Sequence, residues 1–581
     1  MIRSTSTALL ATSILFGTAC SRGTENGGSE SSASWSPQNP TSVQGVAAAS
    51  IKSALSQRLG TPRPAKLDED QWAHTLRLYR MYGDNPLWLS PEGLHGDRAF
   101  ALTNAILGAE SDGMRMDRYP IGDLAQAIAA VHQAKTPTAQ QLAEADVLLT
   151  ASFAALGEDY LTGQVDPKTV AQSWHIDPQE ENVDSALVRG LRNPALDKSI
   201  ATMRPQDDDY AGLRRELDRF QKIVVGGGWP VVPAGDALKP GEAGDPARLA
   251  ALRARLAAEG IGVPAAPPAR ASLIPVPQGN RQPAPARSNI YDRGLAAAVA
   301  QFQARHGIVV DSALGAETME SLNLPAQYRM AQIAANLERL RWLPRSFGSR
   351  YIFVNVPAFR LEAYDAGKKT LEMKVIVGQE YEDRITPVFS DSMEYVVFRP
   401  FWLVTPGIAE KELFPKIAAN PGYLGDNDYE IYTAQGQRRI RQKPGGKNSL
   451  GLVKFIFPND FNIYLHDTPN RELFEKDVRG FSHGCIRVER PEQLAQFVLG
   501  WDLAKITEQM RQGPDDRRVN LSRKIPVYIT YGTAYIRSGQ LYFGNDLYDR
   551  DDKLVQAVYR GALPSTEVVQ AVQALRRIAA R

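Results

Sequence analysis

Cysteine is nearly absent from this chain of 581 residues. Its two cysteines, Cys20 and Cys485, are too few for a disulfide-stapled small domain or a four-cysteine zinc site. The seven histidines are scattered, so we predict no metal and no other cofactor. An excess of one charge is also missing. The 67 basic and 65 acidic residues leave a net charge of +2, which gives no reason to expect a nucleic-acid partner.

Long hydrophobic runs are missing after residue 20, where none reaches the ~18 residues of a membrane-spanning helix. Before it, Arg3 precedes the apolar stretch Ala8–Phe16, which predicts an export signal over residues 1–20 and a periplasmic location. Gly17-Thr18-Ala19-Cys20 resembles a bacterial lipoprotein box, although Leu is usual at the first position. Two alternatives stay open, a membrane anchor through lipidated Cys20 and plain secretion. A Cys20–Cys485 disulfide is disfavoured, because it would join a signal region to a reactive loop.

The length predicts three or four domains, and composition divides them. A Ser-, Gly- and Pro-rich start predicts a flexible tether, and apolar residues at helical spacing then predict a helical scaffold. The predicted parts are a tether at 21–64, the scaffold at 65–224, a helical module at 225–324 with a Pro/Ala-rich insertion at 264–285, a linker helix at 325–349, a β domain at 350–532 with a helical insertion at about 406–447, and C-terminal strands and a helix at 533–581, the helix beginning at Thr566.

From Arg350 the apolar period changes from helix to strand. Leu371, Met373, Val375 and Val377 stand at alternate positions, and Glu372 and Lys374 separate the first three, as on a sheet with one buried face. We therefore predict a multidomain α+β protein whose β domain is mainly antiparallel.

The stretch 464–488 carries the chemistry. His466 ends one apolar run, and Ser482-His483-Gly484-Cys485 leads into another. A thiol is a nucleophile only as thiolate, and an imidazole beside it can lower its pKa, so both histidines are candidates for that role. Gly484 leaves room for a carbonyl to approach, and the N–H groups of Gly484 and Cys485 can face a developing oxyanion. The alternative is a buried, inert cysteine with two core histidines.

His466, followed after fifteen residues by Ser482-His483-Gly484-Cys485, resembles the signature of the L,D-transpeptidases, the YkuD-type cysteine enzymes of bacterial cell walls. The resemblance implies that Cys485 is the nucleophile, that His466 is its general base, and that His483 lines the site and supports the oxyanion region. The family commonly has Asn where Arg487 stands, but Cys-Ile-Arg-Val resembles the large periplasmic subtype. That subtype also implies a helical scaffold, and it makes the insertion at 406–447 a cap.

A second resemblance covers Ala298–Asn323. Phe302-Gln303, Asp311, Gly315 and Thr318 are similar to the three-helix peptidoglycan-binding module, with Ser312 where Gly is usual. These matches are residues that build the fold, so they predict the module better than they predict glycan binding.

Four further residues complete the predicted site. Asp467 can orient His466, but neighbouring strand residues face opposite ways, so we favour a backbone carbonyl in that role. Ser482 either bonds into the site or caps the turn. Ser482, Arg487, Asn448 and Asp467 are the predicted substrate contacts, and Lys454 lies in the same candidate stretch as Asn448.

The predicted function is L,D-transpeptidation between peptidoglycan stem peptides. By the resemblance, a Cys485 thioester forms with release of D-alanine and gives a 3-3 cross-link, and carbapenems inhibit the enzyme. A hydrolase or amidase that uses water, a transpeptidase that attaches a lipoprotein to the wall, and a non-catalytic wall-binding lipoprotein are the alternatives. Protein partners and the oligomeric state are not predicted.

Overall fold

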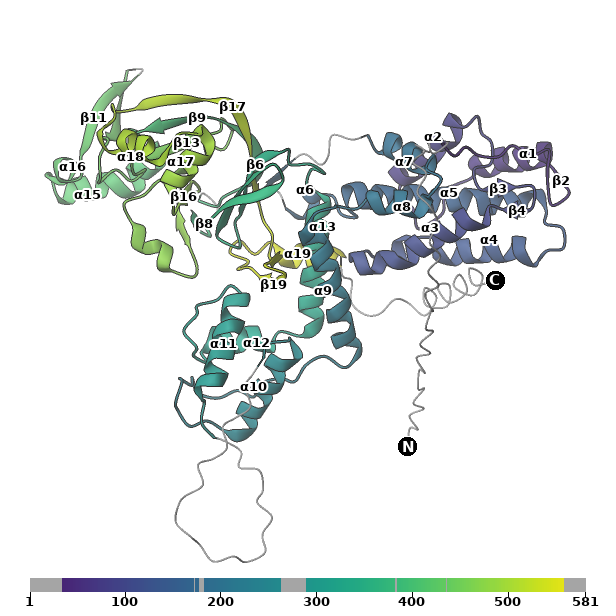
Figure 1. The fold of residues 1–581 in the computed structure, drawn as a ribbon, viewed down its shortest axis with the longest axis horizontal. Coiled ribbons are helices and arrows are strands. Elements are labelled where there is room, and N and C mark those ends of the chain that lie inside the picture. The colour runs from purple at the N-terminus through teal and green to yellow at the C-terminus, as the bar shows by residue number, and fades with distance from the viewer. Residues whose placement is uncertain are drawn as a thin grey trace, which may run out of the picture.

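The computed structural model describes residues 34–171, 173–176, 182–262, 289–381, 384–434 and 436–558. Figure 1 shows a helical scaffold at one end, a β domain at the other, and a small helical module below the helices that join them. The predicted export signal, Cys20, the 264–285 insertion and the predicted helix from Thr566 lie outside the described residues. Within the described part, no helix combines the length and the apolar character needed to cross a membrane.

The scaffold is built around one long buried helix, α5 (Ala139–Thr162), which other helices cover. The scaffold elements are β1 (Ser42–Val43), β2 (Val46–Ala47), α1 (Ala48–Leu59), α2 (Glu69–Met81), β3 (Leu89–Ser90), β4 (Gly93–Leu94), α3 (Gly96–Gly108), α4 (Ile121–Gln133), α6 (Pro167–Val170), α7 (Val183–Leu191) and α8 (Leu196–Thr202). The predicted tether at 21–64 is wrong for residues 48–59, because these residues form the helix α1. Ile51 and Leu55 lie one helical turn apart and are buried against α5.

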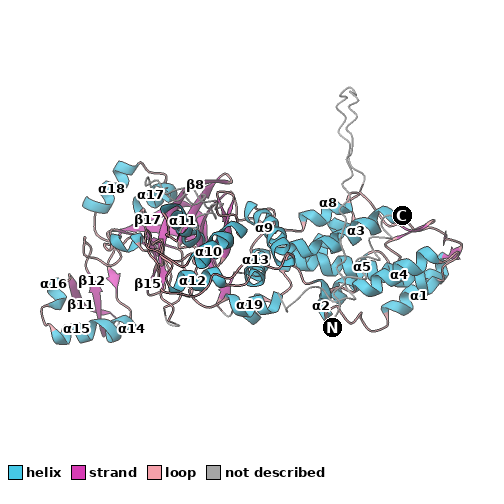
Figure 2. Cartoon of the chain, turned by 90° about the horizontal axis from the view of Figure 1, so that it is seen from below, coloured by secondary structure: helices cyan, strands magenta, loops and turns pink. Residues whose placement is uncertain are grey.

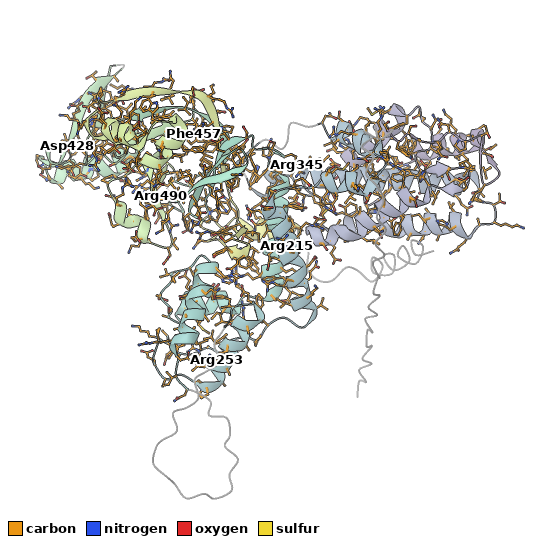
Figure 3. All side chains as sticks on the ribbon, in the orientation of Figure 1. Arg215, Arg253, Arg345, Asp428, Phe457 and Arg490 are labelled. Carbon is orange, nitrogen blue, oxygen red and sulfur yellow. The ribbon has the colours of Figure 1, made fainter. Side chains whose placement is uncertain are left out.

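Two long helices, α9 (Asp208–Val225) and α13 (Ala326–Arg341), pack together between the scaffold and the β domain. Glu338 and Arg341 form a fully buried ion pair on α13, and Arg341 also donates to the carbonyl of Asp112 at 2.8 Å. Arg345, labelled in Figure 3, donates to the carbonyl of Tyr160. Because the bonds to Asp112 and Tyr160 join residues far apart in sequence, they fix the scaffold against the chain that enters the β domain.

The small module holds α10 (Pro246–Ala258), α11 (Arg293–Arg305) and α12 (Ala316–Asn323) around Phe302. The Gln303 amide donates to Asp311, Thr318 and the Ala313 carbonyl at 2.8–3.2 Å. The motif residues therefore brace the fold, as the sequence indicates. Ser312 adopts a left-handed backbone, φ 60°, which explains why glycine suits this position in similar modules.

Strands of the β domain close into a barrel. Its wall consists of β6 (Arg350–Asn355), β7 (Arg360–Asp365), β8 (Lys368–Gly378), β9 (Val388–Phe398), β13 (Val453–Ile456), β14 (Leu465–His466), β16 (Ile486–Val488) and β17 (Arg517–Thr530). In the order β13-β14-β16-β8-β7-β6-β17-β9 each strand pairs with the next, and β13 also pairs with β9. Most of these pairs are antiparallel, but β14–β16 and β17–β6 are parallel. The α+β prediction is confirmed, and the sheet closes on itself through the β13–β9 pairing.

Other elements attach to this barrel. They are β5 (Trp174–His175), β15 (Gly480–Ser482), α17 (Pro491–Leu499), α18 (Leu503–Gln512), β18 (Ala534–Arg537), β19 (Gln540–Phe543) and α19 (Asp551–Val558). The scaffold's own strand β5 pairs with β9, so the two parts share one sheet.

The insertion after β9 forms a separate lobe at the end of the molecule away from the scaffold (Figure 2). It contains β10 (Trp402–Leu403), α14 (Pro406–Ile408), a π-helical turn (Ala409–Leu413), α15 (Phe414–Ala419), α16 (Tyr423–Asp426), β11 (Tyr429–Ala434) and β12 (Gln437–Gln442). The insertion is therefore only partly helical, because β10, β12 and β11 form a three-stranded sheet. We call residues 402–447 the cap.

Candidate active site

The predicted nucleophile and base lie on neighbouring strands. β14 and β16 run parallel, with Leu465 opposite Ile486 and His466 opposite Arg487. Leu465 and Ile486 are buried in the barrel core. Because side chains alternate along a strand, Tyr464, His466, Cys485 and Arg487 share the opposite, outer face. Lys454 joins them, because it pairs with His466 across β13 and β14. We call these five residues the catalytic face.

The Cys485 thiol is half-buried and donates a hydrogen bond to the carbonyl of Asn462, with 3.6 Å between sulfur and oxygen. Burial raises the pKa of the thiol to about 11, and Tyr464, Arg487 and Lys454 lower it only in part. The sequence-based expectation that a neighbouring imidazole lowers this pKa does not hold in this structure. Cys485 is therefore a neutral thiol at rest.

His466 is held in one orientation by the backbone. Its Nδ1 lies 2.6 Å from the carbonyl oxygen of Asp467, so Nδ1 carries the proton and Nε2 is the basic atom. Burial, followed by the positive charge of Arg487, lowers the pKa of His466 to about 3. The imidazole is thus neutral at pH 7, as a general base must be. Of the two predicted orienting groups, the structure shows the backbone carbonyl.

The turn before Cys485 is braced from inside. The Ser482 hydroxyl donates to the Cys485 carbonyl and accepts from the Gly484 N–H at 3.1 Å. Thr386 donates to the Gly484 carbonyl at 2.8 Å, and Gly484 has φ 108°, a conformation that favours glycine. Since Ser482 occupies the Gly484 N–H, the pair of predicted oxyanion donors reduces to the Cys485 N–H, which has no acceptor among the described residues.

His483 contacts the cap. Its Nε2 lies 2.6 Å from Oε1 of Glu412, which is in the π-helical turn of the cap. Arg384 donates to the same carboxylate oxygen at 3.1 Å. Burial alone would raise the pKa of Glu412, but His483 and Arg384 outweigh it and hold the pKa below its usual value. The cap is therefore attached to the residue two before the nucleophile.

Comparison with known proteins identifies three regions of the chain. Residues 349–529 match the family model described as the L,D-transpeptidase catalytic domain, YkuD. They form an L,D-transpeptidase catalytic domain. Residues 73–217 match a model described as a scaffold domain, and residues 279–322 match one described as "Putative peptidoglycan binding domain". The resemblances stated from the sequence are confirmed.

A protein of Haemophilus influenzae named "Putative L,D-transpeptidase" is 34% identical over 247 residues, which span 38% of this chain and 48% of that protein. The match thus covers about half the length of this curated relative. The solved structure of the L,D-transpeptidase (residues 123-326) from Xylanimonas cellulosilytica is 14% identical and matches over 51% of this chain and 99% of that chain. Its TM-score is 0.15.

Three of the predicted substrate contacts in the transpeptidase domain are turned inward. Asn448 is fully buried and donates to the carbonyls of Pro400 and Lys443. The Asp467 carboxylate is buried and accepts from the Leu452 N–H at 2.8 Å, while Ser482 is occupied by the turn. Because their polar atoms are already bonded inside the fold, these side chains support the site without facing a substrate. Arg487 alone of the four lies on the catalytic face.

The sequence reading gave no role to Tyr464 or Glu412. Burial raises the pKa of Tyr464 well above its usual range, so its hydroxyl stays protonated and can donate to the Cys485 sulfur. The sequence could have identified Tyr464 as a site residue, because it lies two residues before His466 and therefore faces the same side of the strand. Nothing in the sequence places Glu412 beside His483, which is 71 residues away.

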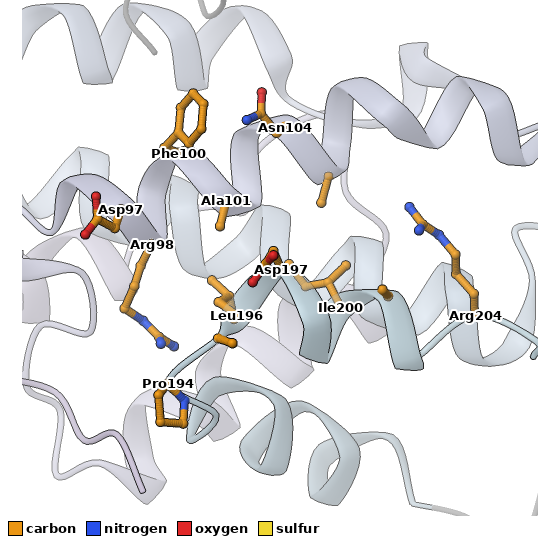
Figure 4. A pocket seen from close by; sticks show the side chains of 13 residues that line it. Asp97, Arg98, Phe100, Ala101, Asn104, Pro194, Leu196, Asp197, Ile200 and Arg204 are labelled. Carbon is orange, nitrogen blue, oxygen red and sulfur yellow. The ribbon is translucent and has the colours of Figure 1, made fainter. Parts of the chain in front are cut away.

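Two other features of the described residues bear on the site. They contain no group of three or more His, Cys, Asp or Glu side chains that could hold a metal ion. A pocket of about 470 Å³ lies between α3 and α8 of the scaffold, lined by Phe100, Leu196 and Ile200 among others (Figure 4). Its lining contains no Cys, Ser, His or Lys side chain, and it lies in the scaffold and not in the β domain that carries Cys485.

Proposed function

We propose that this protein is an L,D-transpeptidase that forms 3-3 cross-links between the tetrapeptide stems of peptidoglycan. The observation that carries the proposal is the catalytic face, where Cys485 and an oriented, neutral His466 lie on adjacent parallel strands. The matching peptidoglycan-binding and transpeptidase domains support peptidoglycan as the substrate. Cysteine acyl transfer is the chemistry that such a thiol and base perform.

The first half of the reaction acylates the thiol. The hydrogen bond from Cys485 to Asn462 breaks, and Nε2 of His466 takes the thiol proton as sulfur attacks the carbonyl carbon of the third stem residue. The oxyanion accepts a hydrogen bond from the Cys485 N–H. The tetrahedral intermediate collapses, the bond to D-alanine breaks, and the imidazolium gives its proton to the departing amine. A thioester remains on Cys485.

The second half transfers the acyl group to an amine. The side-chain amine of a third residue on another stem attacks the thioester carbonyl and gives a proton to His466. The carbon–sulfur bond breaks, and the thiolate regains that proton from the imidazolium. The cap favours the amine over water, because the contact of its Glu412 with His483 ties the lobe to the catalytic motif, where it can exclude water.

The cellular setting follows from the N-terminal sequence. We propose export to the periplasm, with the acylated Cys20 as a membrane anchor and the helical module as a wall contact. The mass of the mature N-terminus distinguishes a lipidated cysteine from plain cleavage.

The products of a purified stem identify the reaction. The protein is incubated with disaccharide-tetrapeptide, and the masses are recorded. A dimer that has lost one D-alanine supports transpeptidation, a monomer that has lost D-alanine supports the hydrolase, and an unchanged monomer with an intact thiol supports the wall-binding alternative. Cys485→Ala removes both enzymatic products if Cys485 is the nucleophile, whereas retained turnover contradicts this mechanism.

A further inference from the structure

Two cations flank the base on the catalytic face. Lys454 pairs with His466 across β13–β14, and His466 pairs with Arg487 across β14–β16, so the three residues form a row over three adjacent strands. Neighbouring strands lie about 4.8 Å apart, which puts the two cationic residues on opposite sides of His466. Cys485 is two residues before Arg487 on the same face.

Neither cation has a partner in the part of the chain that the structure describes. Both side chains are half-buried, and neither makes a hydrogen bond or an ion pair there. The carboxylates that act on them do so only through space, Asp516 on Lys454 and Glu472 on Arg487. Burial lowers the pKa of both groups. By contrast, the nearby Arg384 and Arg471 are each paired with a carboxylate.

The nitrogens of both cations keep access to solvent, because none of them is among the described buried polar atoms without a partner. A ligand of opposite charge can therefore take the place of water there. Their charges lower the pKa of the Cys485 thiol only in part, since burial outweighs them and leaves it at about 11. An ammonium and a guanidinium on either side of a neutral base instead match one carboxylate, held by charge-assisted hydrogen bonds.

We propose that Lys454 and Arg487 bind a carboxylate of the donor stem, the free α-carboxylate of the D-alanine that leaves. This inference rests on the proposed function. The carboxylate is three bonds from the carbonyl carbon that Cys485 attacks, and Cys485 and Arg487 are about 7 Å apart along the strand. A side-chain carboxylate on the third residue is the other source of the same chemistry, and it lies six bonds away on a flexible chain.

The test compares three stems, namely the tetrapeptide, the same stem with its terminal carboxylate converted to a carboxamide, and a stem with lysine in place of a diaminopimelate at the third position. Release of the terminal residue is measured by mass spectrometry for the wild type, Lys454→Met, Arg487→Met and the double variant. Lys368→Met is the matched control, because Lys368 is exposed on the β7–β8 hairpin.

For the wild type and for Lys368→Met, we expect kcat/KM to be about 10- to 100-fold lower with the carboxamide stem than with the tetrapeptide. The double variant shows the same low rate with both stems. Its midpoint of thermal unfolding does not fall, since the substitutions remove unpaired charges, whereas a structural role for these cations would lower it.

Three outcomes would overturn the carboxylate site: a wild type that treats acid and amide alike, a double variant that still distinguishes them, or sensitivity only to the third-position carboxylate. A wild type inactive on every stem would instead contradict the proposed function. Calorimetric titration of Cys485→Ala with acid and amide stems then decides the site without turnover. Tighter binding of the acid that requires both cations upholds it, and equal binding overturns it.

Discussion

The protonation state of Cys485 gives the sharpest prediction, because the structure departs there from the usual picture of a thiolate–imidazolium pair. Burial raises the thiol pKa from 9.0 to about 11. At neutral pH a thiol with a pKa near 11 has a thiolate fraction a hundredfold smaller than one with a pKa of 9.0. At pH 7 about one molecule in ten thousand therefore carries the anion. His466, with a pKa of about 3, contributes no positive charge above pH 5.

Alkylation by iodoacetamide measures this fraction. The rate at the peptide that contains Cys485 is followed by mass spectrometry from pH 5 to 11, with a small free thiol as reference. We expect the rate to rise about tenfold per pH unit and to level off only near pH 11. Because His466 is neutral, His466→Gln shifts this profile little. A plateau already present at pH 6–7, or a large upward shift of the thiol pKa in His466→Gln, would refute the neutral pair.

Further predictions concern the cap, the turn, the scaffold and acid stability. Glu412→Ala, which frees His483, is expected to lower the ratio of cross-linked to hydrolysed product about tenfold, while the exposed neighbour variant Glu410→Ala keeps it. Gly484→Ala forces φ 108° on alanine, at a cost of about 1–3 kcal/mol. We expect this variant to lose turnover while its melting temperature falls only slightly. A normal kcat would contradict the need for this turn. Glu338→Gln leaves the buried Arg341 unpaired and should lower the free energy of unfolding by about 3–5 kcal/mol in urea, an unchanged value counting against the buried pair. Since the pKa of His466 falls from 6.5 to about 3, its neutral form stabilises the fold fully above pH 6.5 by about 5 kcal/mol, and this stabilisation is lost as pH falls toward 3. His466→Asn should flatten that part of the stability curve.

Alternation and spacing predicted much of the β domain. Leu371, Met373, Val375 and Val377 alternate because one face of β8 packs inside the barrel. The same rule puts Cys485 and His466 on one face once their strands pair. Closure of the barrel was not predictable, since it depends on β13 pairing with two partners far apart in sequence.

The parts that the sequence did not reveal depend on contacts between distant segments. Glu412 meets His483 across 71 residues, and Trp174 brings a scaffold strand to β9. The inward direction of Asn448 depends on the carbonyls of Pro400 and Lys443, which come together only when the chain at both ends of the cap has folded. The pKa of Cys485 could not be read from its neighbours in sequence, because burial outweighs them. The helix α1 could have been predicted from Ile51 and Leu55, which were hidden by the Ser-rich composition around them.

The covalent intermediate tests the central claim most directly. The protein is mixed with a tetrapeptide stem, quenched in acid within seconds, and its intact mass is recorded before digestion. The account predicts an adduct equal to the stem less D-alanine, located on Cys485 and cleaved by hydroxylamine as a thioester. Turnover of the stem with no such adduct under any quench time, or an adduct on another residue, would contradict it.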